Sequence, residues 1–336
     1  MIVVTGGTGF IGSNLVRALN RRGERDIVIV EDLERAADAR IVESLTFAEL
    51  VDYREFAANL DAWEGRGVHA VFHQGACSDT MVHDGAYMLE RNYTFSQRLL
   101  EFSLGRCPFI YASSAAIYGR GARGFREERD CEWPLNAYAF SKFLFDRHVR
   151  AEEKRSGGFP TQVVGLRYFN VYGPQENAKG RMASLLFQFH GQAKEGGRLR
   201  IFAGSEGFLR DFVFVDDVVR VNLDFLDHPE RSGIFNCGSG TARSFRELAE
   251  LTAAHYSGPD GTPGGCAVET IPFPEELAGR YQDHTLADLT RLRAAGYGAS
   301  FTPLEEGVAR YVEVLKATGG YHPPAAAAPQ AQNLNK

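Results

Sequence analysis

A tyrosine and a lysine four residues apart are the side chains of this chain best suited to acid–base chemistry. Tyr138 and Lys142 would share one face of a helix, because residues four apart lie one turn above another. A nearby ammonium lowers the pKa of a phenol, which can then exchange a proton with a sugar hydroxyl or carbonyl. Ser114 precedes this pair by twenty-four residues.

Glycines at the N-terminus predict a nucleotide-binding turn. Gly6, Gly9 and Gly12 follow the apolar residues 2–4 and open a helical stretch. Glycine lets the backbone approach a pyrophosphate, whose charge is stabilised at a helix N-terminus. A glycine-rich turn without a ligand is the alternative, but the strand before it and the helix after it favour binding. Together with the Tyr/Lys pair, this turn predicts an NAD(P)-dependent enzyme.

Short β-branched runs alternate with helical stretches through the first half of the chain. We expect strands at 2–4, 27–30, 68–73, 109–112 and 163–167, and helices at 12–22, 90–104 and 137–155. Near-continuous hydrophobicity is typical of buried parallel strands. The pattern predicts an α/β fold: a Rossmann-type doubly wound parallel sheet with a smaller α/β substrate-binding lobe.

The second half suggests where this lobe is inserted. We assign residues 1–170 and 212–235 to the dinucleotide-binding domain, and residues 171–211 and 236–316 to the substrate-binding lobe. Further elements are expected at 183–193, 212–216, 217–226 and 245–256. Residues 317–336 contain a Pro-Pro pair, an alanine run and Gln/Asn, so we expect a disordered tail.

The composition of the chain argues against several classes of protein. The chain has 336 residues and a net charge of -6, which argues against nucleic-acid or anionic membrane partners. We find no membrane-length apolar run and no basic segment of a signal peptide after Met1. Five cysteines without CxxC spacing favour reduced thiols over disulfides or a zinc site. We expect a cytoplasmic protein without a metal.

The end of the second strand carries opposing signals about the cofactor. Glu31 and Asp32 lie where an adenosine ribose would bind, and Asp32 favours NAD because it would repel a 2′-phosphate. Arg35, Arg40 and Arg54 follow closely and could neutralise that phosphate, or they could be ordinary solvated charges. The residues alone leave NAD and NADP both open.

A loop of small residues follows the strand at 68–73. It consists of Gln74, Gly75, Ala76, Cys77 and Ser78, at a strand end where such folds hold the middle of a dinucleotide. Asn92, early in the next helix, could bond this loop or the cofactor, or could be an ordinary polar helix residue.

These motifs resemble the extended short-chain dehydrogenase/reductase family, whose members act on nucleotide-diphosphate sugars. The resemblance rests on the three glycines, the run Tyr-Ala-Ser-Ser-Ala-Ala-Ile-Tyr-Gly at 111–119 and the Tyr/Lys pair, with Arg-Asp-Phe-Val at 210–213. Residues 74–80, 141–146, 167–174, 179–184 and 202–205 are similar to the narrower family of ADP-L-glycero-D-manno-heptose 6-epimerases. The similarity extends from Met1 to about Lys316.

The resemblance implies a reaction at C6″ of an ADP-heptose. Bound NADP would take up a hydride and return it to the opposite face, supplying heptose for the lipopolysaccharide core. Inversion needs an acid/base on each face, and the resemblance assigns these roles to Tyr138 and Lys179. From the sequence alone, Lys179 is an ordinary loop lysine. Ser114 would bond the reacting oxygen, and Lys142 would hold the nicotinamide ribose.

The resemblance also implies binding residues and a homo-oligomer, a homopentamer in that family. Cofactor contacts are expected at Gly6, Gly9, Phe10, Ile11, Gly12, Glu31, Asp32, Arg40, Arg54, Gln74, Gly75, Ala76, Cys77, Ser78, Asn92, Lys142, Val171 and Lys179. Substrate contacts are expected at Asn170, Arg181, Gln188, Phe202, Ala203, Gly204, Ser205, Arg210 and Tyr281.

Some positions depart from the family pattern or have a second explanation. Arg181 and Gln188 replace a serine and a histidine that contact the sugar, and an Asp-Asn pair is replaced by Glu-Asp at 31–32. The guanidinium of Arg210 suits a diphosphate, although a surface salt bridge to Asp211 or Asp216 is the alternative.

Other functions on the same scaffold are the main competing hypotheses. A nucleotide-sugar 4,6-dehydratase usually has Asp-Glu where this chain has Ala115 and Ala116, and a 4-epimerase would not need Lys179. A redox-sensing regulator typically loses the tyrosine or the lysine, and this chain has both.

Overall fold

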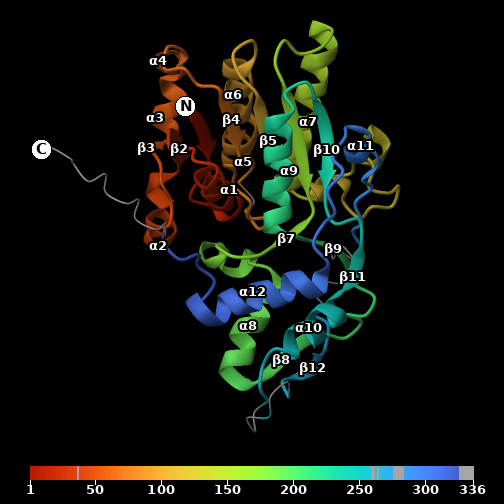
Figure 1. The fold of residues 1–336 in the computed structure, drawn as a ribbon. Coiled ribbons are helices and arrows are strands. Elements are labelled where there is room, and N and C mark those ends of the chain that lie inside the picture. The colour runs from red at the N-terminus through yellow and green to blue at the C-terminus, as the bar shows by residue number, and fades with distance from the viewer. Residues whose placement is uncertain (36–37, 83, 259–261, 263–264, 275–283, 325–336) are drawn as a thin grey trace, which may run out of the picture.

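A seven-stranded parallel sheet is the centre of the computed structural model, which describes residues 1–35, 38–82, 84–258, 262, 265–274 and 284–324 (Figure 1). Its order is β10-β6-β5-β4-β1-β2-β3. The strands are β1 (Ile2–Thr5), β2 (Ile27–Glu31), β3 (Glu49–Asp52), β4 (Ala70–His73), β5 (Phe109–Ser114), β6 (Val163–Tyr168) and β10 (Gly233–Cys237). In register, Val4 pairs with Ile29 on one side and Phe72 on the other. The parallel doubly wound sheet is confirmed.

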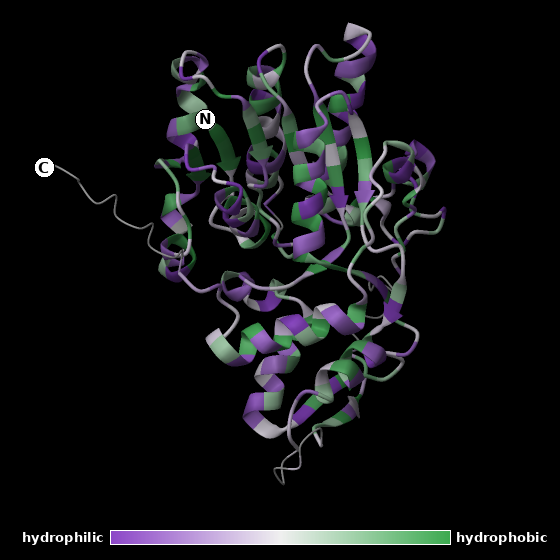
Figure 2. Cartoon of the chain, viewed as in Figure 1, coloured by the Kyte–Doolittle hydropathy of each residue, from purple (hydrophilic) through white to green (hydrophobic). Residues whose placement is uncertain are grey.

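Helices cover both faces of this sheet. Alternate residues of a strand point to opposite faces, so Val4 packs in one core and Val3 in the other. On the Val4 side lie α1 (Phe10–Arg21), α2 (Ala39–Glu43), α9 (Val215–Asp227) and α11 (Thr290–Ala294). On the Val3 side lie α3 (Tyr53–Ala58), α4 (Leu60–Glu64), α6 (Phe95–Ser103) and α7 (Ala137–Ser156). Figure 2 shows the hydrophobic strands between these helices.

Shorter helical segments join the strands of this domain. They are α5 (Gly85–Leu89), the π-helical turn η2 (Glu90–Thr94) and the 3-10 turns η1 (Leu33–Arg35), η3 (Ala115–Tyr118) and η4 (Arg129–Cys131). The helix expected at 90–104 therefore begins as a π-helix. Such turns occur often at functional sites.

A smaller lobe lies beyond the carboxyl ends of the sheet strands (Figure 1). It contains the three-stranded sheet β11-β9-β7 and the pair β12-β8. Its elements are β7 (Asn170–Tyr172), η5 (Asn177–Met182), α8 (Leu185–Gly196), β8 (Arg198–Phe202), β9 (Leu209–Phe214), β11 (Ala242–Ser244), α10 (Phe245–Ala253), β12 (Ala267–Ile271) and α12 (Leu304–Thr318). Leu186, Leu248 and Val308 meet in a separate core.

The domain boundaries differ in detail from those expected. The strand predicted at 212–216 is β9, which ends at Phe214 and pairs with β7 and β11 outside the central sheet. Helix α9 then returns to the large domain. Leu292 of α11 also packs in the central core, so the chain crosses between the lobes more often than the sequence predicted.

The segment after α12 corrects the expectation of a disordered tail from residue 317. Tyr321 packs against the central core, and the His322 ring nitrogen Nε2 lies 2.7 Å from Asn14 Oδ1. Asn14 Nδ2 donates to two carbonyl oxygens, so Oδ1 accepts and Nε2 of His322 carries the proton. Residues 325–336 lie outside the described part of the chain.

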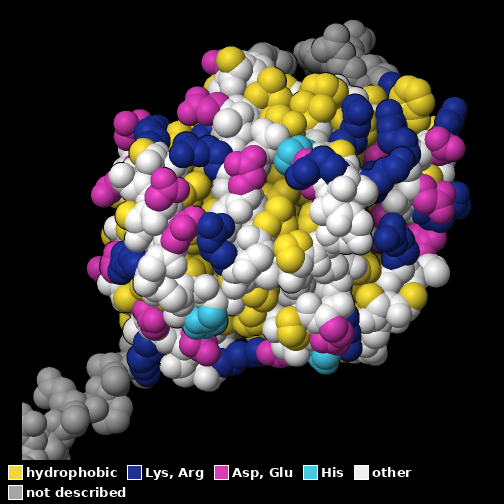
Figure 3. Space-filling model, turned by 90° about the horizontal axis from the view of Figure 1, so that it is seen from above, with side chains coloured by type: hydrophobic (Ala, Val, Ile, Leu, Met, Phe, Trp, Pro, Cys, Tyr) yellow, Lys and Arg dark blue, Asp and Glu magenta, His cyan; other side chains and the backbone are white. Residues whose placement is uncertain are grey.

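The surface mixes both signs of charge. Figure 3 shows Lys and Arg beside Asp and Glu over the face that it draws. Across the described residues, the structure has no helix with the length and hydrophobicity needed to span a membrane. Cys77, Cys107, Cys131, Cys237 and Cys266 are all free and buried.

Candidate active site

The glycine turn between β1 and α1 has the close contacts that a pyrophosphate-binding loop needs. Gly6 has a φ of +65°, and a Cβ there would lie 2.6 Å from Gly75. A Cβ on Gly12 would lie 2.0 Å from the Gly6 carbonyl oxygen, so both positions require glycine. Gly9 begins α1 without a side-chain cap, so the first N–H groups of the helix remain available to a ligand. The turn therefore fits the diphosphate of a dinucleotide.

The two acidic residues at the end of β2 form hydrogen bonds and ion pairs within the protein. Glu31 accepts a 2.6 Å hydrogen bond from the Thr8 hydroxyl and thereby fastens the glycine turn. Asp32 is 5% exposed and pairs with Arg54 at 3.2 Å. Arg91 approaches its other oxygen at 3.8 Å. Arg91 could not be identified from the sequence, because an arginine within a helix carries no signal for a buried partner.

Arg40 lies on α2, against the segment that follows α12. Its guanidinium carbon is 5.0 Å from the centre of the Tyr321 ring. The Tyr321 hydroxyl donates to Asp38, whose carboxylate also caps α2. Arg40 is exposed, so its guanidinium is accessible to a ligand beyond the end of β2.

The loop after β4 is fixed by a buried asparagine. Asn92 accepts from Cys77 N at 2.8 Å and donates to Cys77 O at 2.9 Å. It also donates to Ser141 on α7 at 3.0 Å. Asn92 is fully buried, and of the three roles left open by the sequence, its hydrogen bonds to Cys77 correspond to holding the loop. Gln74 is likewise held in place, because its Oε1 accepts a hydrogen bond of 2.9 Å from the Tyr168 hydroxyl.

Ser114, Tyr138 and Lys142 come together at the carboxyl end of β5. The pKa of Tyr138 is raised, mainly because the phenol is buried. A hydrogen bond with Ser114 acts in the opposite direction, and Cys77 adds a smaller increase. Lys142 Nζ donates to the Ala112 carbonyl at 2.7 Å. The expected lowering of the Tyr138 pKa by Lys142 is therefore wrong for this arrangement, because desolvation is the largest effect.

Lys142 is itself strongly affected by its surroundings. Its side chain is 4% exposed, and burial lowers its pKa to about 8. Asp146, one turn further along α7, acts in the opposite direction. Asp146 accepts from Tyr111 and from Arg167 Nε, each at 2.9 Å, and Arg167 also pairs with Glu132. This buried network anchors α7 to β5 and β6.

Lys179 lies on η5, beside the start of α1. Its Nζ is 4.7 Å from the centre of the Phe10 ring and 3.4 Å from Glu176 Oε2. Glu176 is fully buried and accepts two 2.6 Å hydrogen bonds from Ser184. Gln175, with φ +77°, receives the segment after α12 through its N–H to the Gly320 carbonyl. These contacts fasten the loop that carries Lys179 beside the start of α1.

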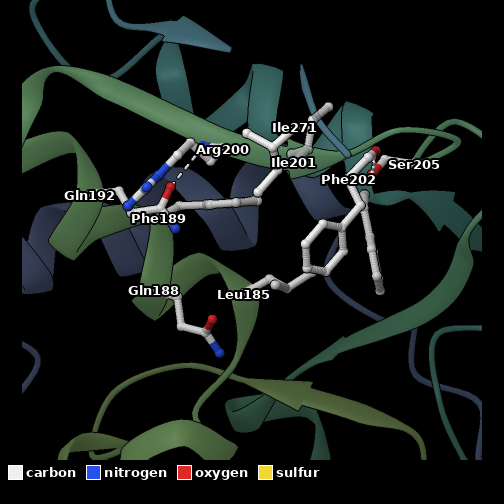
Figure 4. A pocket seen from close by; sticks show the side chains of 10 residues that line it. Leu185, Gln188, Phe189, Gln192, Arg200, Ile201, Phe202, Ser205 and Ile271 are labelled. Carbon is white, nitrogen blue, oxygen red and sulfur yellow. Dashed lines mark hydrogen bonds between the residues drawn. The ribbon is translucent and has the colours of Figure 1, made fainter. Parts of the chain in front are cut away.

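A pocket of about 280 Å³ opens in the small lobe (Figure 4). Gln188 of α8, Phe202 at the end of β8 and the following Ser205 line it, so three expected substrate positions share one cavity. Ala203 N bonds Ile271, and Gly204 has a φ of +85°, which turns the chain at the rim.

The remaining expected substrate positions surround the boundary between the lobes. Arg181 pairs with Asp79 at 3.1 Å, mostly in solvent. Asn170 of β7 is exposed and accepts from Thr285, and Val171 is half-buried beside it. Tyr281 lies outside the described residues.

Arg210 does not lie on the surface as the salt-bridge alternative assumed. It is 6% exposed, and its guanidinium is 5.1 Å from the Phe245 ring centre. Asp211 instead accepts from Ser239 and from backbone N–H groups, and Asp216 pairs with Arg310.

Comparison with known proteins defines the class first. The pattern of the NAD dependent epimerase/dehydratase family matches residues 2–238, and the chain belongs to this family. It is 48% identical, over 96% of its length and 99% of the relative's, to ADP-L-glycero-D-manno-heptose-6-epimerase of Brachyspira hyodysenteriae. The enzyme of that name from Pseudomonas aeruginosa is 51% identical, with 94% and 98% covered.

Solved structures agree with this assignment. The fold matches ADP-L-glycero-D-manno-heptose-6-epimerase of Helicobacter pylori with a TM-score of 0.78 and 28% identity, covering 94% of this chain and 96% of that one. UDP-glucose 4-epimerase of Thermus thermophilus, solved with NAD, matches with a TM-score of 0.74 and 28% identity, covering 94% and 98%.

Proposed function

We propose that this protein interconverts ADP-D-glycero-β-D-manno-heptose and ADP-L-glycero-β-D-manno-heptose at C6″, for synthesis of the lipopolysaccharide core. The observation that carries the proposal is the contact of Tyr138 with Ser114 at the end of β5, one helical turn from Lys142. Relatives about 50% identical over nearly the whole chain carry the 6-epimerase name.

The chain's own residues divide the work of such a reaction. A bound nicotinamide dinucleotide would supply the hydride acceptor and donor. Tyr138 takes the proton of the C6″ hydroxyl or returns it, and Ser114 orients that oxygen by a hydrogen bond. Lys142 positions the nicotinamide ribose. The glycine turn and the loop fixed by Asn92 hold the cofactor, so its nicotinamide end is directed towards Tyr138.

Inversion requires a second acid/base, and we assign it to Lys179. The position of its ammonium beside Phe10 and Glu176 supports this role, since a loop lysine in solvent would have neither contact. Glu176 restrains Lys179 to one place without removing it from the site, because Lys179 keeps 27% of its side chain exposed.

The small lobe would bind the ADP portion of the substrate. The buried guanidinium of Arg210 suits a diphosphate, and the pocket with Gln188 and Phe202 offers an amide and an aromatic ring for recognition. Asn170, Arg181 and Tyr281 complete the proposed set of contacts.

For the cofactor we propose NADP over NAD. Arg40 and Arg54 lie beyond the end of β2, where only NADP places an additional phosphate. Reversing both charges with Arg40→Glu and Arg54→Glu should weaken NADP more than NAD. Equal losses for the two cofactors would remove the support that these arginines give to NADP.

We further propose that the enzyme acts in the cytoplasm as a homo-oligomer. Five free, buried cysteines suit a reducing compartment. The homopentamer is supported by the family resemblance, and sedimentation of the purified protein tests it directly.

The decisive experiment follows the configuration of C6″ by NMR after purified protein is incubated with ADP-D-glycero-D-manno-heptose. The proposal requires equilibration of the two epimers without added cofactor, because the cofactor is regenerated in every turnover. UDP-glucose is the discriminating second substrate. Conversion of UDP-glucose at C4, with ADP-heptose unchanged, would instead establish a 4-epimerase.

A further inference from the structure

A buried arginine without enough protein partners lies beneath the proposed adenosine site. Arg91, on the π-turn η2, is 7% exposed. Its guanidinium carbon lies 3.5 Å from the centre of the Tyr53 ring. Within the described residues, its Nε and Nη1 have no hydrogen-bond partner. Burying a charge is costly unless it is paired and hydrogen-bonded, so this arrangement needs an explanation.

The nearest negative charge is Asp32, the residue that the sequence associates with NAD. Arg91 Nη2 lies 3.8 Å from Asp32 Oδ2, and Arg54 Nη1 lies 3.2 Å from Asp32 Oδ1. Each carboxylate oxygen therefore faces a different guanidinium. Arg54 is also paired with Glu34 and Asp52, so Arg54 is shared among three acids, while Arg91 is directed at Asp32.

An acid at this position normally selects NAD, because its charge repels a 2′-phosphate and its oxygens accept from the ribose hydroxyls. A guanidinium cannot lose its proton in a protein. Arg91 therefore offsets the charge of the Asp32 carboxylate. The ring of Tyr53 fixes the plane of the guanidinium, and its buried position keeps water from screening the pair.

We propose that Arg91 is a specificity-determining residue: it offsets Asp32 and so allows the site to accept the 2′-phosphate of NADP. The inference rests on the dinucleotide site proposed above. It concerns how the NADP/NAD affinity ratio depends on Arg91, whichever cofactor the protein prefers.

The test compares Arg91→Met with Arg91→Lys. Methionine keeps length and contact with the Tyr53 ring but removes the charge, and lysine restores the charge. Affinities for NADPH and NADH are measured by fluorescence titration of protein stripped of nucleotide. We expect Arg91→Met to lower the NADPH/NADH affinity ratio about tenfold, and Arg91→Lys to recover most of it. Arg98→Met, at an exposed position on α6, the helix that follows η2, should leave the ratio unchanged.

A double-mutant cycle with Asp32→Asn separates this role from a structural one. If Arg91 acts through Asp32, then Arg91→Met should not change the ratio when Asp32 is already Asn. Equal weakening of both cofactors by Arg91→Met, or an unchanged effect in the Asp32→Asn background, would overturn the inference.

The outcomes are distinct from failure of the proposed NADP preference. A wild-type protein that prefers NADH, but prefers it more strongly after Arg91→Met, would refute the NADP proposal and sustain the inference. A wild-type protein that prefers NADPH, with an affinity ratio that Arg91→Met does not change, would sustain the NADP proposal and refute the inference about Arg91.

Discussion

Replacing Lys142 by methionine should stabilise the protein while it removes activity. The interval between the ordinary pKa of 10.5 and the value of about 8 in the fold corresponds to about 3 kcal/mol of cost for burying the charged ammonium. Methionine avoids this cost but leaves the Ala112 carbonyl without its donor, which costs about 1 kcal/mol. The variant should therefore gain about 2 kcal/mol at pH 7, or roughly 3 °C in Tm.

The stability difference between Lys142→Met and the wild type should depend on pH. The folded pKa of Lys142 lies below the unfolded one, so the unfolded chain binds more protons between pH 8 and 10.5. Wild-type stability therefore rises with pH across that window. The advantage of Lys142→Met should be full below pH 8 and should shrink by about 1.4 kcal/mol for each further pH unit.

Thermal unfolding of both proteins, stripped of nucleotide and scanned from pH 6 to 9.5, measures this difference. Lys154→Met is the matched control, because Lys154 is exposed on the same helix. Its effect on Tm should be small and independent of pH. A Lys142→Met protein that is no more stable than wild type at pH 7, or whose advantage stays constant with pH, would refute the reasoning.

Tyr138→Phe and Lys179→Met should each lower epimerisation by about 10²–10⁴-fold with nearly unchanged affinity for ADP-heptose by calorimetry; near-normal activity of Lys179→Met would exclude it as the second base. Asn92→Leu should cost about 2–4 kcal/mol in urea unfolding, because it leaves both buried polar groups of the Cys77 backbone without partners; a loss below 0.5 kcal/mol, about the size of a surface substitution, would contradict this. Tyr321→Ala should lower Tm by roughly 3 °C. Tyr321→Phe keeps the ring over Arg40, so its Tm should stay close to the wild-type value. Equal Tm values for the two variants would show that the ring contributes nothing.

The parts of the fold that the sequence predicted are those with strong local patterns. The five strands expected in the central sheet are all present there, because each is a near-continuous apolar run buried on both faces. The two strands of the central sheet that the sequence did not predict lack this pattern. Strand β3 (Glu49–Asp52) is half-buried at the sheet edge with an acid at each end, and β10 (Gly233–Cys237) begins with glycine and contains an asparagine.

The same distinction separates predictable from unpredictable site residues. Tyr138 and Lys142 are linked by one helical turn, and the glycines by a short turn and the first turn of α1. Their spacing in sequence therefore reports their spacing in the fold. Arg91 meets Asp32 across 59 residues. No periodicity marks such a pair, and an arginine in a polar helix stretch is indistinguishable from a solvated one.

Buried ion pairs that are distant in sequence are therefore where sequence analysis is weakest and where the structure adds most. Arg167 is fully buried between Asp146 and Glu132, and these three residues tie together β6, α7 and the loop before α7. Breaking a buried pair by removing one partner costs about 3–5 kcal/mol, because it leaves an uncompensated charge. Asp146 also raises the pKa of Lys142 against the effect of burial, so the charge that anchors α7 is the same one that keeps the proposed cofactor lysine protonated near neutral pH. The stability of this network and the chemistry of the site are thus coupled through a single carboxylate.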